Sequence, residues 1–184
     1  MSDPQSQEQV PNSSPCGPSS TTGEEWFDVV DLHDQVIDRK PRSVVHRDRL
    51  LHRAVHIFVF RPTGEMLIHK RSPAKEEFPS VWTSSASGHV SSNETYDESA
   101  PRELEEELGI RSELLRREKF PACAETSWEF TVLYTTTSDA TIHFDPVEMT
   151  EVRWMFPSEI EAWLNATPTD FSPAFALLFR WLRQ

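Results

Sequence analysis

The sequence predicts an α/β protein in which a mixed β-sheet is packed between helices. Three patterns support this fold class: a hairpin pattern over residues 52–72, an amphipathic helical pattern over 95–109, and alternating strand and helix patterns from 127 onwards. Strands interspersed with helices in this order favour one sheet that is covered on both faces. A chain of 184 residues is long enough for one such domain.

The first 23 residues are predicted to form a disordered tail. Eighteen of them are Ser, Pro, Gln, Thr, Asn or Gly. A segment with so few apolar side chains cannot offset the entropy that is lost when it becomes ordered. A single folded domain is therefore expected over residues 24–184, and no internal repeat is visible.

Strand patterns begin the domain. Residues 27–39 (FDVVDLHDQVIDR) predict two short strands around the polar DLHD. In the hairpin, Val55, Ile57 and Val59 alternate with the residues between them, and PTGE supplies the turn. Another strand is expected over residues 81–90 (VWTSSASGHV).

Residues 95–109 (TYDESAPRELEEELG) predict a helix. Thr95 and Glu98 have the spacing of a capping box, and Gly109 fits a C-terminal stop. Pro101 lies inside this helix, where a proline removes a backbone donor and favours a kink. Beyond it, strands are expected over 127–137 and 151–156, and helices over 158–165 and 172–183.

Charge and composition restrict the partners of the protein. The net charge is -12 with a pI near 5.0, which argues against nucleic acid and anionic membranes as partners because both require a positive surface. Cys16 and Cys123 are the only cysteines, so a disulfide framework is not expected. The sequence shows no secretion signal and no long apolar run. These features predict a soluble, cytoplasmic protein with reduced thiols.

The 95–109 helix carries an acidic face. At 3.6 residues per turn Glu103, Glu106 and Glu107 share one side, while Glu105 points roughly the opposite way. Arg102 precedes Glu106 by four residues and can pair with it. An apolar stripe lies between the two acidic sides, made of Ala100, Leu104 and Leu108. Clustered carboxylates suit Mg²⁺ or Mn²⁺, and a solvated acidic surface is the alternative.

The full spacing favours the metal site. Gly88, Glu94 and the run from Arg102 to Ile110 (RELEEELGI) resemble the complete Nudix box, with every specified position present over 23 residues. The resemblance implies a Nudix-type α/β/α sandwich that binds Mg²⁺, with Mn²⁺ as a substitute, and hydrolyses a small-molecule diphosphate linked to another group. It also admits a homodimer.

The resemblance assigns roles residue by residue. It implies that Glu106 and Glu107 are metal ligands, and that Glu103 is a ligand or the base that activates water. The carbonyl of Gly88 would face the metal. Two further residues are given an orienting role, Arg102 and Glu94. Glu148 lies where many Nudix enzymes carry another acidic residue near the metals.

Residues 52–90 contain His52 before Arg53-Ala54, a KRS..K..FP..WT run over 70–83, and His89, and TPTDFSPAF follows at 167–175. This pattern resembles that of isopentenyl-diphosphate isomerases. It implies metal binding by His52 and His89, with His46 as a third candidate; the alternative is that all three are polar residues with ordinary hydrogen bonds. The isomerases have a catalytic cysteine where this chain has Ser87. A serine hydroxyl is a far weaker acid than a thiol, so this substitution argues against isomerase chemistry.

Basic and aromatic residues near the box complete the set of candidates. Lys70, Arg71 and Lys75 are predicted to bind phosphate oxygens, against the alternative of plain surface charge. Weaker metal candidates are Glu125 and Glu129. The indoles of Trp82 and Trp128 either stack on a base or lie in the core.

The leading prediction is a Mg²⁺-dependent hydrolase that cleaves the diphosphate linkage of a nucleoside-diphosphate-type substrate with an activated water. One alternative is an isomerase of isoprenoid diphosphates. A second alternative is a nucleotide-binding module that has kept the fold without turnover. The choice of substrate depends on loops outside the box.

Overall fold

The computed structural model describes residues 24–184, so the predicted tail and Cys16 lie outside the described residues. The elements in chain order are β1 (Trp26–Val30), β2 (Val36–Pro41), α1 (Arg42–Asp48), β3 (His52–Phe60), β4 (Met66–Arg71), β5 (Trp82–Thr83), β6 (Ala86–His89), α2 (Tyr96–Leu108), β7 (Leu115–Phe120), β8 (Glu129–Thr137), β9 (Met149–Met155), α3 (Pro157–Ala166), a 3₁₀ turn (Pro168–Asp170) and α4 (Pro173–Leu182).

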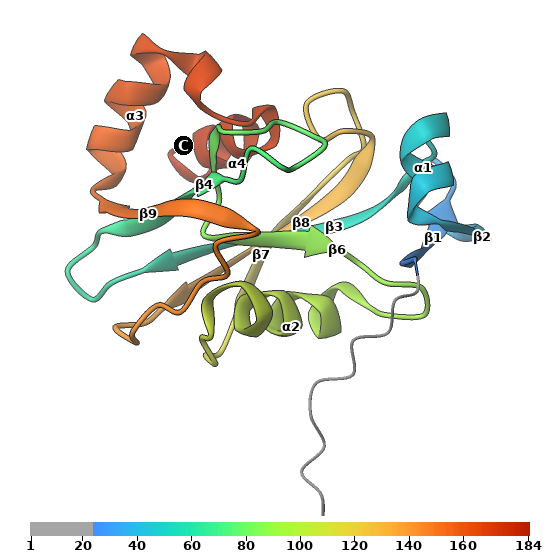
Figure 1. The fold of residues 1–184 in the computed structure, drawn as a ribbon, viewed down its shortest axis with the longest axis horizontal. Coiled ribbons are helices and arrows are strands. Elements are labelled where there is room, and N and C mark those ends of the chain that lie inside the picture. The colour runs from blue at the N-terminus through green and yellow to red at the C-terminus, as the bar shows by residue number, and fades with distance from the viewer. Residues whose placement is uncertain (1–23) are drawn as a thin grey trace, which may run out of the picture.

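The main sheet is mixed, as predicted. Its central path runs β5-β4-β3-β8-β7, with β6 paired to β3 and β9 paired to β4. Strands β3 and β8 are parallel, while the other neighbours in this sheet are antiparallel. The hairpin β1–β2 forms a separate two-stranded sheet and lies with α1 at one end of the molecule (Figure 1).

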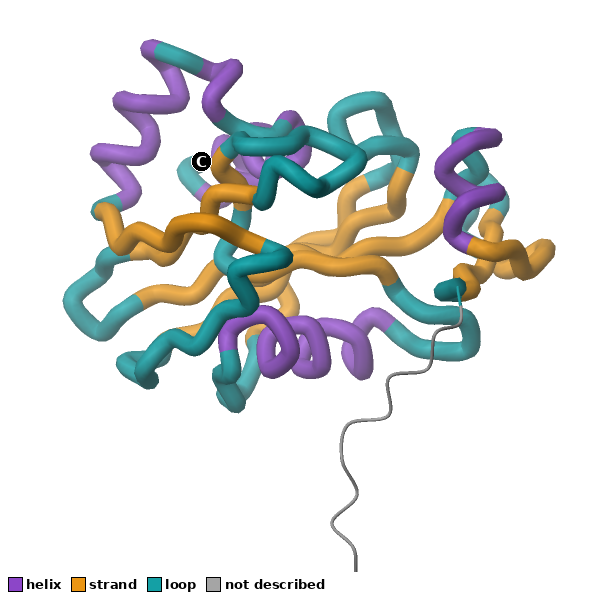
Figure 2. The backbone as a smooth tube through the Cα atoms, in the orientation of Figure 1, coloured by secondary structure: helices purple, strands orange, loops and turns teal. Residues whose placement is uncertain are grey.

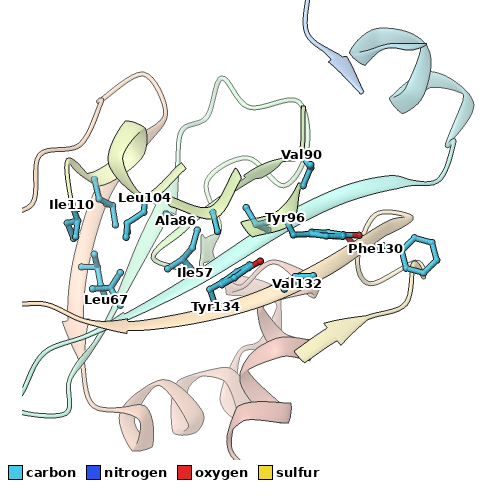
Figure 3. Packing of buried hydrophobic residues seen from close by; sticks show 14 of the residues in the cluster. Ile57, Leu67, Ala86, Val90, Tyr96, Leu104, Ile110, Phe130, Val132 and Tyr134 are labelled. Carbon is cyan, nitrogen blue, oxygen red and sulfur yellow. The ribbon is translucent and has the colours of Figure 1, made fainter. Parts of the chain in front are cut away.

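Helices cover both faces of the main sheet, which confirms the sandwich. Helix α2 lies on one face, and α3 and α4 lie on the other (Figures 1 and 2). The alternation along β3 explains this. Val55 and Ile57 belong to the core under α2, where Figure 3 shows Ile57 near Leu104, while Phe58 belongs to the core under α4.

The main sheet splits at one place. Strands β3 and β4 pair only at Phe60 and Met66, next to their turn. Farther along, β6 pairs with β3, and β5 and β9 pair with β4. The two halves of the sheet therefore diverge and leave room for a cavity between them.

Three local features differ from the sequence-based expectations. The strand expected over 81–90 is broken into β5 and β6, because the hydroxyl of Ser85 turns inward to donate to the Leu67 carbonyl and accept from the Val59 N–H. Helix α1 was not predicted, since Val45 is its only buried residue and it has no side-chain cap. Strand β7 was missed because only its last residue is buried.

Candidate active site

Helix α2 is fixed at both ends and along its apolar side. Thr95 and Glu98 form the predicted capping box, and Gly109 closes the helix in the left-handed conformation with a φ of 67°. The helix continues through Pro101 from Tyr96 to Leu108. Its buried residues face the sheet, namely Tyr96, Ser99, Ala100, Leu104 and Leu108. This anchoring directs the acidic side away from the hydrophobic core.

The carboxylates of α2 separate as predicted. Glu103, Glu106 and Glu107 line a cavity, whereas Glu105 pairs with Arg111 on the surface. Gly88 of β6 lies directly against Glu103. A Cβ added at Gly88 would be 2.1 Å from the carboxyl carbon of Glu103, so any larger residue would displace that side chain.

The Arg102 guanidinium bridges the carboxylates of Glu94, Glu103 and Glu106. Its Nε and Nη2 each donate to Glu94 at 2.8 Å, and its Nη1 donates to Glu103 at 2.7 Å and to Glu106 at 3.0 Å. Nη2 also donates to the carbonyl of His89 at 3.2 Å. Neighbouring carboxylates, Glu94 above all, raise the pKa of this guanidinium, which stays charged. The pairing of Arg102 with Glu106, four residues on, is confirmed.

Burial opposes charge on two of these carboxylates. It raises the pKa of Glu103 to about 6 and, together with the charge of Glu103, that of Glu107 to about 8. The Ser87 N–H donates to Glu107 Oε2 at 3.0 Å, which favours the charged form but does not offset burial. Hard oxygen donors crowded in this way fit a divalent cation such as Mg²⁺, which would relieve the repulsion.

The cavity lies where the sheet splits and has a volume of about 590 Å³. The proposed ligands meet cationic side chains here: Gly88, Glu103, Glu106, Glu107 and Glu148 share the cavity wall with Arg42, Arg71, Lys75 and Arg102. Both signs of charge therefore face one space of a size that suits a small-molecule ligand.

The 72–81 loop forms one side of this cavity. Arg71 supports it by donating from Nη2 to the Glu77 carbonyl at 2.9 Å and from Nε to the Phe78 carbonyl at 3.1 Å. Lys75 pairs with the Glu148 carboxylate across the opening. Burial lowers the pKa of Lys75 and Arg71. The loop is therefore tied to the cavity wall by two cations that the sequence predicted as phosphate contacts.

A histidine cluster borders the carboxylates. Each of His46, His52 and His89 offers a ring nitrogen, and these atoms lie within 4.8 Å of one another. In the described residues, the buried Nε2 atoms of His46 and His52 have no hydrogen-bond partner. Glu129 Oε1 lies 3.0 Å from His89 Nε2 and 3.4 Å from His52 Nε2, the second contact lacking hydrogen-bond geometry. Three imidazoles and a carboxylate are a donor set that fits a transition-metal ion.

Comparison with known proteins agrees with this geometry. A family model described as the NUDIX domain matches residues 50–175. The chain belongs to the Nudix family. An uncharacterized Nudix hydrolase of Yersinia pestis is 35% identical over 154 residues, covering 83% of this chain and 85% of the relative. An isopentenyl-diphosphate Δ-isomerase of Nocardia farcinica is 31% identical over 156 residues, covering 81% and 89%.

A solved structure shares the fold. The crystal structure of DR0079 from Deinococcus radiodurans superposes with a TM-score of 0.75 at 29% identity, covering 85% of this chain and 98% of that chain. The likeness to an isomerase sequence also supports the isomerase-like branch of the Nudix family. Among the helices of residues 24–184, none has the length and apolar content that a bilayer crossing requires.

Several candidates lie elsewhere in the Nudix fold. Lys70 is absent from the cavity wall, so its predicted phosphate contact gains no support from the geometry. Trp82 is 4% exposed and packs in the core under α4, while Trp128 is 40% exposed. Glu125 lines a different, apolar cavity. Glu129, by contrast, is brought to the histidines.

Some residues that line the cavity have no signal in the sequence. Arg42 begins α1, and its Nη1 donates to His89 Nδ1 at 3.0 Å. Because arginine can only donate, His89 Nδ1 accepts here and the proton of that ring lies on Nε2, toward Glu129. His56, Thr83 and Ser172 also line the cavity and are buried. They are far apart in the chain, so no local motif connects them.

Proposed function

We propose that this Nudix protein is a Mg²⁺-dependent hydrolase that cleaves the diphosphate linkage of a nucleoside-diphosphate-type substrate with water. The observation that carries the proposal is that carboxylates and cationic side chains line the same cavity. Glu103, Glu106 and Glu107 supply hard oxygen donors on one side, and Arg71 and Lys75 supply cations beside them. A diphosphate between the two groups would bind the cations directly and the carboxylates through metal.

The residues that would hold Mg²⁺, or Mn²⁺ in its place, are Glu106, Glu107, Glu103 and the Gly88 carbonyl, with Glu148 at the opening. A divalent cation supplies Lewis-acid chemistry here, since it neutralises phosphate oxygens and lowers the pKa of water. The raised pKa of Glu107 supports this assignment, because a buried carboxylate without a counter-charge is unfavourable.

The chain itself positions the reactants. Arg102 fixes the carboxylates of Glu103 and Glu106, which keeps both directed at the cavity. Glu103 is proposed to act either as a further metal ligand or as the base that accepts a proton from the attacking water, which a carboxylate close to the metal can do. Water then attacks phosphorus, the bridging P–O bond breaks, and the product carries one new oxygen.

Two cations are proposed to bind the phosphate oxygens. Arg71 uses Nε and Nη2 on loop carbonyls, which leaves Nη1 for a ligand. Lys75 pairs with Glu148, and the three donors of its ammonium group allow it to contact a phosphate oxygen as well.

The histidine cluster is proposed as a separate cation site, with Glu129 as a further donor. Its support is the pair of buried, unpartnered Nε2 atoms of His46 and His52 among the described residues. His89 would join through Nε2 once the proton there is lost, and Nδ1 would then carry the proton. Arg42, which can only donate, would have to release His89 Nδ1 in that state.

One alternative is an isomerase, which adds and removes protons on carbon and therefore needs a positioned acid and base instead of an activated water. Ser87 occupies the position of the isomerase cysteine, and its backbone N–H already serves Glu107. A module without turnover is the other alternative. The buried cluster of Glu103 and Glu107 argues against it, because a simple binding protein has no need for carboxylates that are costly to charge.

One screen tests these alternatives. The protein is incubated with Mg²⁺ and nucleotide sugars, dinucleoside polyphosphates, nucleoside triphosphates, coenzyme A and prenyl diphosphates, in water labelled with ¹⁸O. Hydrolysis should place one labelled oxygen in a phosphate product. Interconversion of isopentenyl and dimethylallyl diphosphate that Ser87→Ala abolishes, with no diphosphate cleaved, would instead establish an isomerase.

A further inference from the structure

Glu77 connects two parts of the site that the proposed function treats separately. It belongs to the 72–81 loop, lines the charged cavity and is half-buried. Its backbone carbonyl accepts from Arg71 Nε at 3.1 Å and from Arg71 Nη2 at 2.9 Å. Its carboxylate reaches the histidine cluster, where Oε1 lies 3.5 Å from His46 Nδ1. Glu77 therefore contacts both a proposed phosphate-binding cation and a proposed cation ligand.

The surroundings of the His46 ring favour one of its two neutral tautomers. The buried Nε2 has no hydrogen-bond partner within residues 24–184, whereas Nδ1 faces the Glu77 carboxylate. An ionised carboxylate can only accept, so it favours the tautomer with the proton on Nδ1 and the lone pair on Nε2. A metal ion binds an imidazole through such a lone pair. Glu77 thus favours the tautomer of His46 that can bind a cation in the cluster.

His52 has the same arrangement with a backbone acceptor. Its Nδ1 lies 2.9 Å from the Leu50 carbonyl, so Nδ1 carries the proton and Nε2 has the lone pair. The contact of His46 differs in two respects. A separation of 3.5 Å is long for a hydrogen bond, and the acceptor is on a separate loop instead of on the neighbouring main chain. A full hydrogen bond to His46 therefore requires the Glu77 side chain, or the 72–81 loop that carries it, to move toward α1.

The 72–81 loop has a backbone conformation that its own residues disfavour. Phe78 and Ser80 have φ values of 47° and 62°, in the left-handed region that is unfavourable for residues with side chains. Arg71 Nε also donates to the Phe78 carbonyl at 3.1 Å. Contacts with neighbouring elements, those of Arg71 among them, therefore hold the loop in place. A stronger contact at Glu77 would add to them.

We infer that Glu77 is a positioning residue that couples the histidine cluster to the 72–81 loop. A cation on His46 Nε2 withdraws electrons from the ring and makes Nδ1–H a stronger donor, so the Glu77 carboxylate closes onto it. The loop and Arg71 are then held at the cavity wall. The coupling is reciprocal, because a loop held in this position raises the cation affinity by the same factor. The inference rests on the proposed cation site and adds the means by which its occupancy reaches the phosphate side.

The first test measures cation affinity. Zn²⁺ is titrated by calorimetry into Glu107→Gln protein, in which the acidic box is weakened, and further variants are made in this parent. Glu77→Gln keeps an acceptor oxygen without its charge and should lower the Zn²⁺ affinity by about tenfold. Glu77→Met removes the acceptor and should lower the affinity further. The Tm of the metal-free protein should stay near that of the parent, which separates positioning from a general loss of stability.

Glu76→Gln is the matched control. It removes the same charge from the neighbouring residue, which lines the cavity but forms no ion pair in the described part of the chain. A general electrostatic effect on a bound cation would appear in this variant as well. The Zn²⁺ affinity of Glu76→Gln should equal that of the parent.

The second test measures the order of the 72–81 loop. Hydrogen–deuterium exchange of its backbone amides should slow when Zn²⁺ saturates the parent. This slowing should be lost in Glu77→Met at saturating Zn²⁺ and kept in Glu76→Gln. Neither test uses a diphosphate, so both can be read whether or not the protein is a hydrolase.

Equal Zn²⁺ affinity in Glu77→Met and the parent, or equal slowing of exchange in both, would overturn the inference and leave the cation site intact. If His52→Gln binds Zn²⁺ as tightly as the parent, the cation site and the inference fail together. If both tests give the expected results and no diphosphate is cleaved in the substrate screen, the inference stands and the proposed hydrolysis fails.

Discussion

Gly88 lies so close to the Glu103 side chain that no carbon atom fits between them: a Cβ on Gly88 would lie 2.1 Å from Glu103 Cδ. The residues are on different elements, β6 and α2, so the contact fixes the distance between the strand and the acidic helix face. The conformation of Gly88 is not the reason for a glycine, because its φ is not positive. Close approach is the reason.

Gly88→Ala should therefore displace Glu103 and lower kcat by about a hundredfold or more, if Glu103 is the base. The free energy of unfolding should change less than the activity, because the carboxylate can rotate away from the new methyl group. Steady-state kinetics and urea unfolding measure the two effects. Full activity in Gly88→Ala would show that the position of Glu103 does not matter for turnover.

Glu106→Gln and Glu107→Gln should each lower turnover by about two orders of magnitude or more, with the fold retained. Both carboxylates face the cavity instead of the core. Glu107→Gln should also raise the Tm of the metal-free protein, since it removes a buried carboxyl whose ionisation opposes folding. Glu105→Gln is the control on the outer side of the same helix. Near-wild-type rates in saturating Mg²⁺ would remove both residues from the metal site.

The histidine cluster should bind a transition-metal ion independently of activity. Mn²⁺ or Zn²⁺ titrated into the protein should raise its Tm. The part of this Tm shift that persists in Glu107→Gln is assigned to the histidine cluster, and His52→Gln should abolish that part. His143→Gln, a change outside the cluster, is the control. An equal shift in His52→Gln and wild type would show that the cluster stays empty.

Acid should weaken the fold through His56 and His69. Burial lowers the pKa of each to about 4, whereas an unfolded histidine titrates near 6.5. Between these values the unfolded chain binds protons that the folded protein does not. The free energy of unfolding should therefore fall as pH decreases through this window, by about 2 kcal/mol per histidine from pH 7 to pH 5. His69→Gln should show a correspondingly smaller fall in urea titrations, and an identical pH dependence would contradict the shifted pKa.

Removal of residues 1–23 should change neither the cooperative melt nor the metal-dependent activity. The reason is the composition of the segment, which is poor in apolar side chains. Calorimetry and the diphosphate assay compare the full chain with one that starts at Glu24. Loss of a cooperative transition in the shorter chain would show that the segment belongs to the folded domain.

The parts of the fold that were predicted correctly have strong local signals. Thr95, Glu98 and Gly109 set the ends of α2, and the alternation of Val55, Ile57 and Val59 set the buried face of β3. Helix α1 and strand β7 lack such signals because tertiary packing holds them instead. Propensity and periodicity cannot detect an element that buries only one of its residues.

The candidate site likewise has one part that a local sequence motif predicts and another part that only the tertiary fold brings together. The acidic box is local, so its spacing predicted that Glu103, Glu106 and Glu107 would share a side. The approach of Arg42 to His89, 47 residues apart, depends on the placement of α1 against the sheet and has no sequence signature. Thr83 and Ser172 are 89 residues apart and meet only because α4 begins beside β5.

The split between β3 and β4 has a consequence for how such an enzyme could diversify. The acidic box and its supporting Gly88 belong to the half built on β3, whereas Thr83 and the start of α4 belong to the half built on β4. Because the halves pair only at Phe60 and Met66, a substitution in one half need not disturb the backbone of the other. Variation in β5 and at the start of α4 could thus exchange one leaving group for another while the hydrolytic half is inherited intact.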